Sequence, residues 1–483
     1  MTRDLARRAV VSNVDQFPTA PRIAVTDPYT GEPIAEVAEC SADDVDQLVG
    51  QAKSALHSGL SRSERIAILE SVTKLLDSRT DELVALIALE TGKSVRDCIG
   101  EVARAKETLR YTIAEARTQT SQVIPADAAP NATDVLAMEL RVPRGVVGAI
   151  TPFNFPVNTA MHKVAPALAV GCPVIHKPAH QTPLTALWLR DLYREAGLPH
   201  SWLEVCTDSG GKAGEALVLH DDVAVISFTG SNRVGWQIAQ QAPKKKVLLE
   251  LGSNAPVIVG PSADIELAAD KIALGAFAAG GQSCISVQRV IVHHSVSQEL
   301  EGALNARTLA LRAGDPFGEG VDVGPLITPE ASQRVRSWVS EAKAAGGEIL
   351  AGSRDSDEAV VAPMVVKNAP RGTRLRDQEV FGPVVIVLEY DAFDEAIALA
   401  NETEFGLQAG VFTRDFGEIM KAFRELEFGG VLINDASTTR LDHQPYGGMG
   451  ESGNTREGPH YAMEELTEIR YLSMRASHLG GAL

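Results

Sequence analysis

A cysteine, a glutamate and an asparagine lie in sequence surroundings where their side chains could do chemistry. Cys284 lies within residues 278–286, where glycines and polar neighbours predict a loop with exposed backbone. A thiolate in such a loop could act as a nucleophile. The alternative is a thiol that only fills space in the core, since free cysteine is among the most buried residue types.

Glu250 lies within an apolar run, residues 247–251, that predicts a strand. A carboxylate in such a strand is rarely fully buried without a reason. Burial would raise its pKa toward that of a useful general base. The alternative is a strand with one wet face, but Leu248 lies on the same face as Glu250 and favours burial.

Asn154 stands between two aromatic residues, themselves flanked by Pro152 and Pro156, at the expected carboxyl end of a strand. Its side-chain amide could donate to an oxyanion that develops during a reaction. The alternative is an asparagine that caps the helix expected to start near Pro156. The local pattern alone favours the cap.

Other residues fit a phosphate-bearing cofactor. Gly230 and Ser231 follow a predicted strand and open a helix, and backbone amides at a helix N-terminus bind phosphate. A tight turn with Ser231 as helix cap explains that pattern equally well. Lys177 ends another predicted strand and could hydrogen-bond a ribose or a phosphate, although a solvated lysine is the commoner case. Glu379, taken alone, is a loop acid.

The elements that must position these residues begin with four helical stretches. Apolar residues recur there at three- and four-residue steps, which is typical of amphipathic helices. The stretches are residues 43–56, 64–76, 81–90 and 101–117. Gly92 and Gly100 fall between the later ones and are expected to end helices.

From Gly145 onward, short β-branched runs alternate with stretches of helical length. The first set predicts strands at residues 146–151, 173–176, 203–206, 223–228, 247–251 and 256–259, with helices at 157–170, 183–196 and 232–241. A second set predicts strands at residues 290–293, 384–390, 410–413 and 431–434. Such alternation indicates parallel sheets covered on both faces, with ligands at the carboxyl ends of the strands. We expect two α/β domains joined near residues 250–260.

Length and composition agree with a protein of two or three domains. A chain of 483 residues exceeds one compact core. Its 45 Lys and Arg against 63 Asp and Glu give a formal charge of −18, which argues against nucleic-acid and anionic-membrane partners. Five scattered cysteines without metal-ligand spacing predict a reducing, cytoplasmic location and no metal site. We expect Cys284 to react and the other four cysteines to pack.

Taken together and in order, the motifs resemble the aldehyde dehydrogenase superfamily over most of the chain, up to Tyr471. The matching segments are residues 151–156, 176–179, 228–231, 249–252, 281–284, 379–383, 445–448, 452–453 and 456–458. The chain departs from the family pattern at Ser253, where a second glycine is usual. It departs again at Met449 and Gly450, which replace a small residue followed by lysine.

The resemblance implies a fold and an assembly. It implies a Rossmann-like cofactor-binding domain of residues 1–117 and 142–252, together with an α/β catalytic domain of residues 253–455. It also implies a small β oligomerisation arm of residues 118–141 and 456–483. Such an arm pairs subunits through edge strands. We therefore expect a homodimer or a homotetramer.

The resemblance also implies a reaction, the oxidation of an aldehyde to the carboxylic acid with NAD or NADP. Cys284 would attack the aldehyde, Asn154 and the Cys284 backbone N–H would stabilise the oxyanion, and Glu250 would activate water to hydrolyse the thioester. The expected cofactor contacts are Thr151, Pro152, Phe153, Lys177, His180, Gly230, Ser231, Glu379 and Phe381. A coenzyme A-acylating enzyme is an alternative that Glu250 disfavours, and a non-catalytic dinucleotide-binding protein is another.

Two features bear on specificity. His180 stands where many NAD-preferring members have a glutamate that would repel a 2′-phosphate, so NADP should be tolerated or preferred. His162, Arg440 and Tyr446 are expected at the substrate. Family members that resemble lactaldehyde, phosphonoacetaldehyde and succinic semialdehyde dehydrogenases share parts of this sequence, especially residues 440–443. They suggest a short polar or anionic aldehyde. The alternative is a purely structural ion pair of Arg440 with Asp442.

Overall fold

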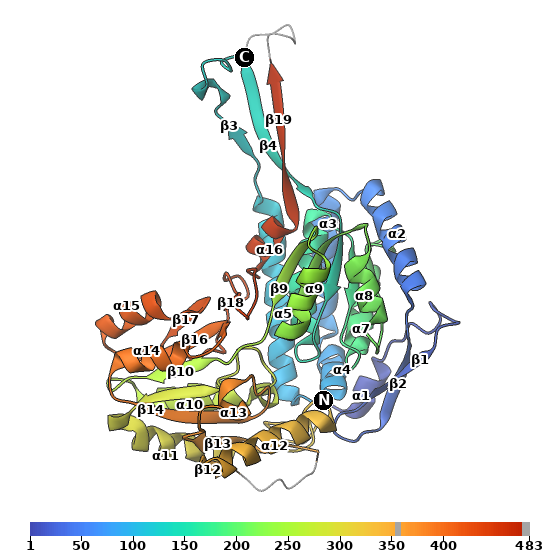
Figure 1. Cartoon of the computed structure of the whole chain (residues 1–483). Coiled ribbons are helices and arrows are strands. Elements are labelled where there is room, and N and C mark those ends of the chain that lie inside the picture. The colour runs from blue at the N-terminus through green and yellow to red at the C-terminus, as the bar shows by residue number, and fades with distance from the viewer. Residues whose placement is uncertain (353–358, 476–483) are drawn as a thin grey trace.

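The computed structural model describes residues 1–352 and 359–475 and builds two sheet-centred bodies and a protruding arm (Figure 1). The last eight residues of the predicted arm segment lie outside the described residues. No helix of the described residues is long and apolar enough to cross a membrane.

The four predicted N-terminal helices are confirmed. They follow a short helix and a hairpin, in the order α1 (Arg3–Arg8), β1 (Arg22–Thr26), β2 (Pro33–Ala38), α2 (Ala42–Ser58), α3 (Arg62–Ser78), α4 (Thr80–Thr91) and α5 (Val95–Thr118). Gly92 ends α4 in the left-handed conformation, as expected. The prediction that Gly100 ends a helix is wrong, because it lies exposed inside α5. The buried stripe of Cys98, Val102 and Ala105 keeps the segment helical, because its packing outweighs the helix-propensity penalty of a glycine, about 1 kcal/mol.

A parallel five-stranded sheet has the order β7-β6-β5-β8-β9. Its strands are β5 (Val146–Ile150), β6 (Val174–Lys177), β7 (Leu203–Val205), β8 (Val223–Thr229) and β9 (Lys246–Glu250), and its helices are α6 (Pro156–Val170), α7 (Pro183–Glu195), α8 (Lys212–Leu219) and α9 (Asn232–Gln241). Val147 and Ala149 enter one apolar cluster, while Val146 and Ile150 enter another. The sheet is therefore doubly wound. Its strand order reverses between β5 and β8, and ligands of such sheets bind at that point.

The second sheet has seven strands in the order β12-β13-β14-β11-β10-β16-β17. The strands are β10 (Pro256–Val259), β11 (Arg289–His293), β12 (Glu348–Gly352), β13 (Met364–Lys367), β14 (Val384–Tyr390), β16 (Gln408–Phe412) and β17 (Gly430–Ile433). The helices are α10 (Ile265–Phe277), α11 (His294–Ala310), α12 (Pro329–Ala344), α13 (Arg374–Asp377), α14 (Phe393–Asn401) and α15 (Phe416–Glu425). Antiparallel β12 and its neighbour β13 were not among the predicted strands.

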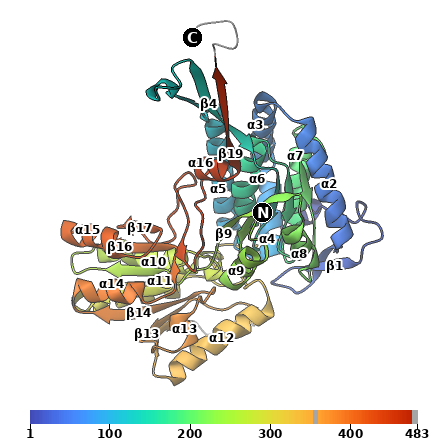
Figure 2. The same cartoon turned by 45° about the horizontal axis from the view of Figure 1, so that its top comes forward.

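The arm is a three-stranded antiparallel sheet that projects from the five-stranded body (Figures 1 and 2). It contains β3 (Gln122–Ile124), β4 (Val135–Pro143) and β19 (Thr467–Arg475), with the short helix α16 (Pro459–Glu465) at its base. Large apolar side chains stay exposed on it, with Val123 70%, Ile469 56% and Tyr471 59% accessible. Two strands more than 300 residues apart in sequence thus form one extended ribbon.

Candidate active site

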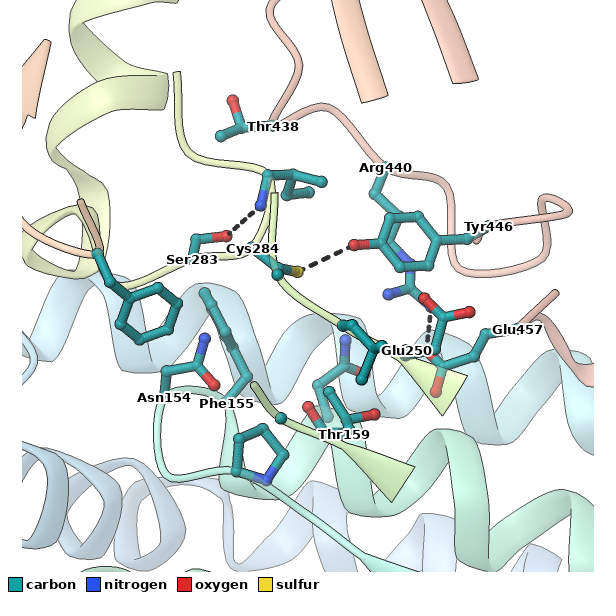
Figure 3. Close-up of a pocket in the computed structure, with 18 of the residues that line it drawn as sticks. Asn154, Phe155, Thr159, Glu250, Ser283, Cys284, Thr438, Arg440, Tyr446 and Glu457 are labelled. Atoms are coloured by element: carbon teal, nitrogen blue, oxygen red, sulfur yellow. Dashed lines mark hydrogen bonds and ion pairs between the residues drawn. The ribbon is translucent and has the colours of Figure 1, made fainter. Parts of the chain in front are cut away.

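A cavity of about 360 Å³ lies between the two sheet-centred bodies (Figure 3). Its lining comes from the loop after β5, the end of β9, the loop before β11 and the C-terminal loops. Twelve of the predicted site residues line it, namely Pro152, Phe153, Asn154, His162, Gly230, Ser231, Glu250, Cys284, Glu379, Phe381, Arg440 and Tyr446. The sequence motifs, scattered over 300 residues, therefore meet in one place.

Cys284 follows a sharply bent loop. Ala279, Gly280 and Gly281 all have left-handed backbone conformations, and a Cβ on Gly281 would come within 2.1 Å of the Gly382 carbonyl oxygen. The glycine is therefore required there. The Cys284 thiol is half-buried in the cavity, with its Sγ 3.1 Å from the Tyr446 hydroxyl. Burial raises the pKa of this thiol to about 12, and the contact with Tyr446 opposes that rise.

Asn154 does not cap a helix, so the reading that its local pattern favours is wrong. The N-cap of α6 is Phe155, and no side chain caps it. The Asn154 amide instead donates to the backbone oxygen of Gln282 at 2.7 Å, two residues before the cysteine. The amide therefore faces the nucleophile loop, with its second N–H left for a ligand.

Two carboxylates one turn apart on α5 hold the loops that carry these groups. Glu101 is buried and accepts from the Val157 and Asn158 backbone N–H groups at 2.8 and 3.1 Å, at the start of α6. Asp97 accepts from the Ala279 N–H at 2.9 Å, in the nucleophile loop. Sequence reasoning missed both residues. Their spacing of four, which places them on one helix face, was the signal that could have found them.

Glu250 is buried, with 3% of its surface accessible. Neither carboxylate oxygen has a hydrogen-bond partner among the described residues. Its Oε1 lies so close to Gly447 that a Cβ there would come within 2.9 Å. Burial, and next the nearby Glu457 carboxylate, raise the pKa of Glu250 well above its ordinary value. The alternative of a wet strand face is wrong, and the free oxygens face the cavity (Figure 3).

Glu457 is a buried partner that sequence reasoning left without a role. It accepts from Lys163 Nζ and from Arg440 Nη2, each at 3.1 Å. Although burial acts to raise it, these two cations hold the pKa of Glu457 down at about 2. Glu457 is therefore ionised at neutral pH, and its charge adds to burial in raising the pKa of Glu250.

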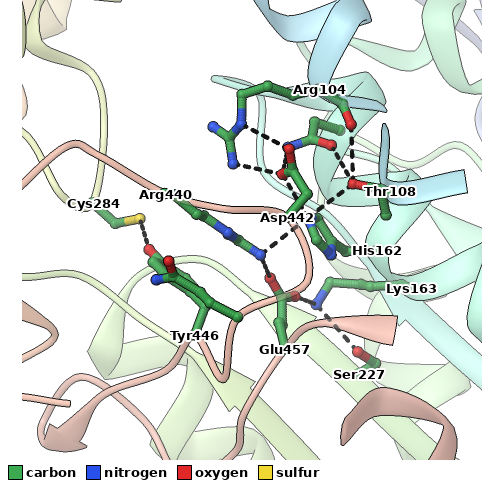
Figure 4. A network of polar contacts seen from close by, with 12 residues as sticks. Arg104, Thr108, His162, Lys163, Ser227, Cys284, Arg440, Asp442, Tyr446 and Glu457 are labelled. Atoms are coloured by element: carbon green, nitrogen blue, oxygen red, sulfur yellow. Dashed lines mark hydrogen bonds and ion pairs between the residues drawn. The ribbon is translucent and has the colours of Figure 1, made fainter. Parts of the chain in front are cut away.

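The end of the cavity beyond Cys284 is a network of charges (Figure 4). The Arg440 guanidinium lies 3.7 Å from the centre of the Tyr446 ring and 3.0 Å from His162 Nε2. Asp442 binds Arg104 at 2.9 Å, and its Oδ1 lies 3.3 Å from the same Nε2 atom of His162. The predicted alternative of an Arg440–Asp442 ion pair is therefore wrong, since Arg440 pairs with Glu457.

His162 in this network is a neutral acceptor. Burial, and then the Arg440 cation, lower its pKa to about 4. Its Nε2 accepts from Arg440, which can only donate. Within this network, as far as the described residues form it, three cations, Arg104, Lys163 and Arg440, pair with two carboxylates, Asp442 and Glu457.

The remaining predicted cofactor contacts gather along the reversal point of the five-stranded sheet. Ser231 occupies the N-cap position of α9 but its side chain caps nothing, so the amides there are free for a phosphate. A second cavity of about 320 Å³ is lined by Lys177, Gly211 and Lys212 beside α9. Buried Thr151 contacts His176 at 2.8 Å, close to the first cavity. These residues fit a dinucleotide.

Three predicted cofactor contacts remain, and only two of them line the first cavity. Glu379 accepts from the Ser253 N–H at 2.9 Å, at the departure from the family pattern, and burial raises its pKa to about 7. Phe381 packs edge-on against Phe153 at 5.8 Å. His180 is exposed and does not line either cavity. The contact of His180 with the cofactor therefore stays a prediction.

Comparison with known proteins agrees with this geometry. The profile of the aldehyde dehydrogenase family matches residues 17–472. The chain is 44% identical over 455 residues to 3-sulfolactaldehyde dehydrogenase from Priestia aryabhattai, covering 94% of this chain and 95% of that protein. It resembles the structure of aldehyde dehydrogenase 21 from Physcomitrella patens with the reaction product succinate, at 36% identity, 95% coverage of both chains and a TM-score of 0.91.

A third relative was solved with a cofactor. Glyceraldehyde-3-phosphate dehydrogenase from Methanocaldococcus jannaschii, complexed with NADP, is 34% identical with a TM-score of 0.89, covering 94% of this chain and 99% of that one. The chain belongs to the aldehyde dehydrogenase family. It is an NAD- or NADP-dependent enzyme that oxidises an aldehyde to the carboxylic acid, so the predicted fold class, activity and cofactors are confirmed.

Proposed function

We propose that Cys284, Glu250 and Asn154 carry out the oxidation, and that the substrate is a small anionic aldehyde. The two guanidinium groups that line the far end of the cavity, Arg104 and Arg440, carry the substrate proposal. The free oxygens of Glu250 and the amide of Asn154 beside Cys284 support the catalytic roles.

The Cys284 thiolate attacks the aldehyde carbon, and the oxygen becomes an oxyanion. The Asn154 amide and the Cys284 backbone N–H donate to that oxygen, a contribution of about 3–4 kcal/mol for each such donor. Ser231, Lys177 and Lys212 would hold NAD or NADP, whose chemistry would be to accept a hydride from this carbon, and the acyl group would then remain on the sulfur. Glu250 then takes a proton from water as the water attacks the thioester, and the acid leaves.

Glu250 must be ionised for this last step, and Glu457 opposes that ionisation. In Glu457→Gln a negative charge disappears while the Lys163 and Arg440 cations stay, so the pKa of Glu250 falls. We expect the acid limb of the kcat–pH profile to move to lower pH by about one unit. Steady-state kcat measured across pH checks this, and a move toward higher pH would contradict it.

Arg104 and Arg440 are proposed to hold the substrate anion. Both line the cavity on the side of Cys284 away from the proposed cofactor contacts, and the Arg440 Nε is buried without a partner among the described residues. Two relatives support this assignment, because one is named for an anionic aldehyde, sulfolactaldehyde, and the other was solved with an anionic product, succinate. Sequence reasoning missed Arg104, which is hidden in the polar pattern of α5.

A panel of anionic and neutral aldehydes tests the substrate proposal. In Arg104→Ala and Arg440→Ala we expect the ratio of kcat/KM for anionic over neutral aldehydes to fall by about tenfold or more, as loss of a hydrogen bond to a charged group implies. Arg110→Ala, an exposed residue of the same helix, is the matched control. An unchanged ratio in both site variants would exclude an anion site there.

The cofactor preference is proposed to include NADP. No carboxylate stands at His180. Two cations, Lys177 and Lys212, line the second cavity with one carboxylate, Glu215, so a 2′-phosphate there meets more positive than negative charge. The kcat/KM values for NAD and NADP are expected to be similar or to favour NADP. A large preference for NAD would overturn this proposal.

The cellular and assembly predictions remain proposals. We infer that the protein is a cytoplasmic homodimer or homotetramer whose subunits touch through the arm. We also propose the domain boundaries that the sequence predicts. The exposed apolar side chains of the arm support the assembly, because such patches mark interfaces. Light scattering that gives the 51.4 kDa mass of one chain would contradict it.

A further inference from the structure

The Tyr446 hydroxyl touches the proposed nucleophile. Its oxygen lies 3.1 Å from Cys284 Sγ (Figure 3), and no other hydrogen-bond partner of either atom occurs among the described residues. The tyrosine backbone is paired with Glu457 in both directions, at 3.2 and 2.5 Å. Its ring is buried and packs with Ile285 and Leu407. The phenol is therefore fixed on the sulfur.

The groups around the sulfur make a negative charge there costly. Burial acts against the thiolate, and so do the Glu379 and Glu250 carboxyls that face it. Two of the described groups that face the sulfur favour the thiolate. The Tyr446 hydroxyl lowers the pKa of Cys284 more than the Arg440 cation does. Asn154 is neutral. The tyrosine is thus the main support that the described residues give a Cys284 thiolate.

The same tyrosine is set up to donate rather than to ionise. Burial, the facing Cys284 and the Glu250 carboxyl raise the pKa of its phenol well above the ordinary value, so it keeps its proton. The Arg440 guanidinium, 3.7 Å from the ring centre and held by Glu457, withdraws charge from the ring (Figure 4). A cation against the ring makes the O–H a stronger donor.

We propose that the Tyr446 hydroxyl is a catalytic hydrogen-bond donor that stabilises the Cys284 thiolate before it attacks the aldehyde. This inference rests on the proposed role of Cys284. On ionisation the thiol proton passes to solvent, the phenol proton stays on Tyr446 Oη, and the O–H points to the sulfur. The role is distinct from the substrate contact expected for Tyr446 from sequence.

The test removes only the hydroxyl, with Tyr446→Phe. The rate of alkylation of Cys284 by iodoacetamide, followed by mass spectrometry of its peptide, is measured across pH in the absence of aldehyde. We expect the midpoint to rise by about one pH unit or more, since a hydrogen bond to a charged group is lost. The midpoint is the readout, because thiolate reactivity itself changes with pKa.

Tyr390→Phe is the matched control. Its buried phenol donates to the Val259 backbone far from the cavity, and its loss should leave the midpoint in place. A midpoint in Tyr446→Phe that is unchanged or lower overturns the inference.

A second arm keeps the native side chain in case Tyr446→Phe folds poorly. The wild-type protein is produced with 3-fluorotyrosine in place of tyrosine. The fluorinated phenol is more acidic and donates a stronger hydrogen bond, so the midpoint of the pH dependence of Cys284 alkylation should fall. A midpoint that stays or rises overturns the inference. Neither arm uses turnover. Continued aldehyde oxidation in Cys284→Ala would instead refute the proposed function.

Discussion

Replacing Cys284 by alanine is expected to abolish aldehyde oxidation, with kcat falling by more than about 10⁴-fold. Half-buried Cys284 alone among the five cysteines lines the cavity beside Asn154 and Glu250, and the other four are fully buried. The loss should be chemical rather than structural, because the side chain packs against little besides Ile285 and Tyr446. Absorbance of the reduced nicotinamide with an aldehyde panel measures the effect.

The control for this variant is Cys172→Ala. Cys172 is buried near the base of the arm, where its thiol donates to the Leu466 carbonyl oxygen. Its loss should leave kcat close to that of the wild type. Binding of NAD or NADP to Cys284→Ala should persist. Residual turnover in Cys284→Ala above that of a blank would show that another group forms the acyl intermediate.

The sheets could be predicted from sequence because their signal is local. Short β-branched runs separated by helical stretches predicted ten of the twelve strands in the two sheets, and only β12 and β13 were missed. Glycine shows where local reasoning ends. Gly92 stops α4 while Gly100 does not stop α5, since buried neighbours from α3, α4 and α6 pack along α5 and outweigh its propensity.

The site was predictable as a set of residues and less so as a set of contacts. Asn154 shows the reason. Its neighbours in sequence indicate a cap, but its partner Gln282 is 128 residues away. Glu101 and Arg104 carried no motif, since their roles depend on α5 passing beside α6 and the nucleophile loop. Only the packing of α5 against the start of α6 reveals Glu101, and only its packing against a C-terminal loop reveals Arg104.

The pairing of Arg440 shows why charge alone could not settle specificity. Sequence spacing favours a partner two residues away, Asp442, but the fold gives Arg440 to Glu457 and Asp442 to Arg104. Both arginines therefore stay beside the cavity. Arg440 also lies against the Tyr446 ring, so the same cation contributes to the proposed anion site and to the surroundings of the nucleophile.

The Glu250→Gln variant is expected to form an acyl-enzyme and then stall. Attack and hydride transfer need Cys284 and Asn154, so about one equivalent of reduced cofactor per site should appear in a burst. Steady turnover should then be about 10²–10⁴-fold slower than in the wild type, the usual contribution of a general base. Stopped-flow absorbance gives the burst, and intact mass shows the acyl group.

Glu90→Gln is the matched control for removal of a buried carboxyl. Burial raises the pKa of Glu90 to about 8, and it caps the start of α7 away from the cavity. Its loss should leave the ratio of burst to steady rate unchanged. Hydroxylamine needs no general base, so it should release the acyl group of Glu250→Gln and restore turnover. Absence of any burst would instead place Glu250 before acylation, because a base needed only for hydrolysis cannot affect the first turnover.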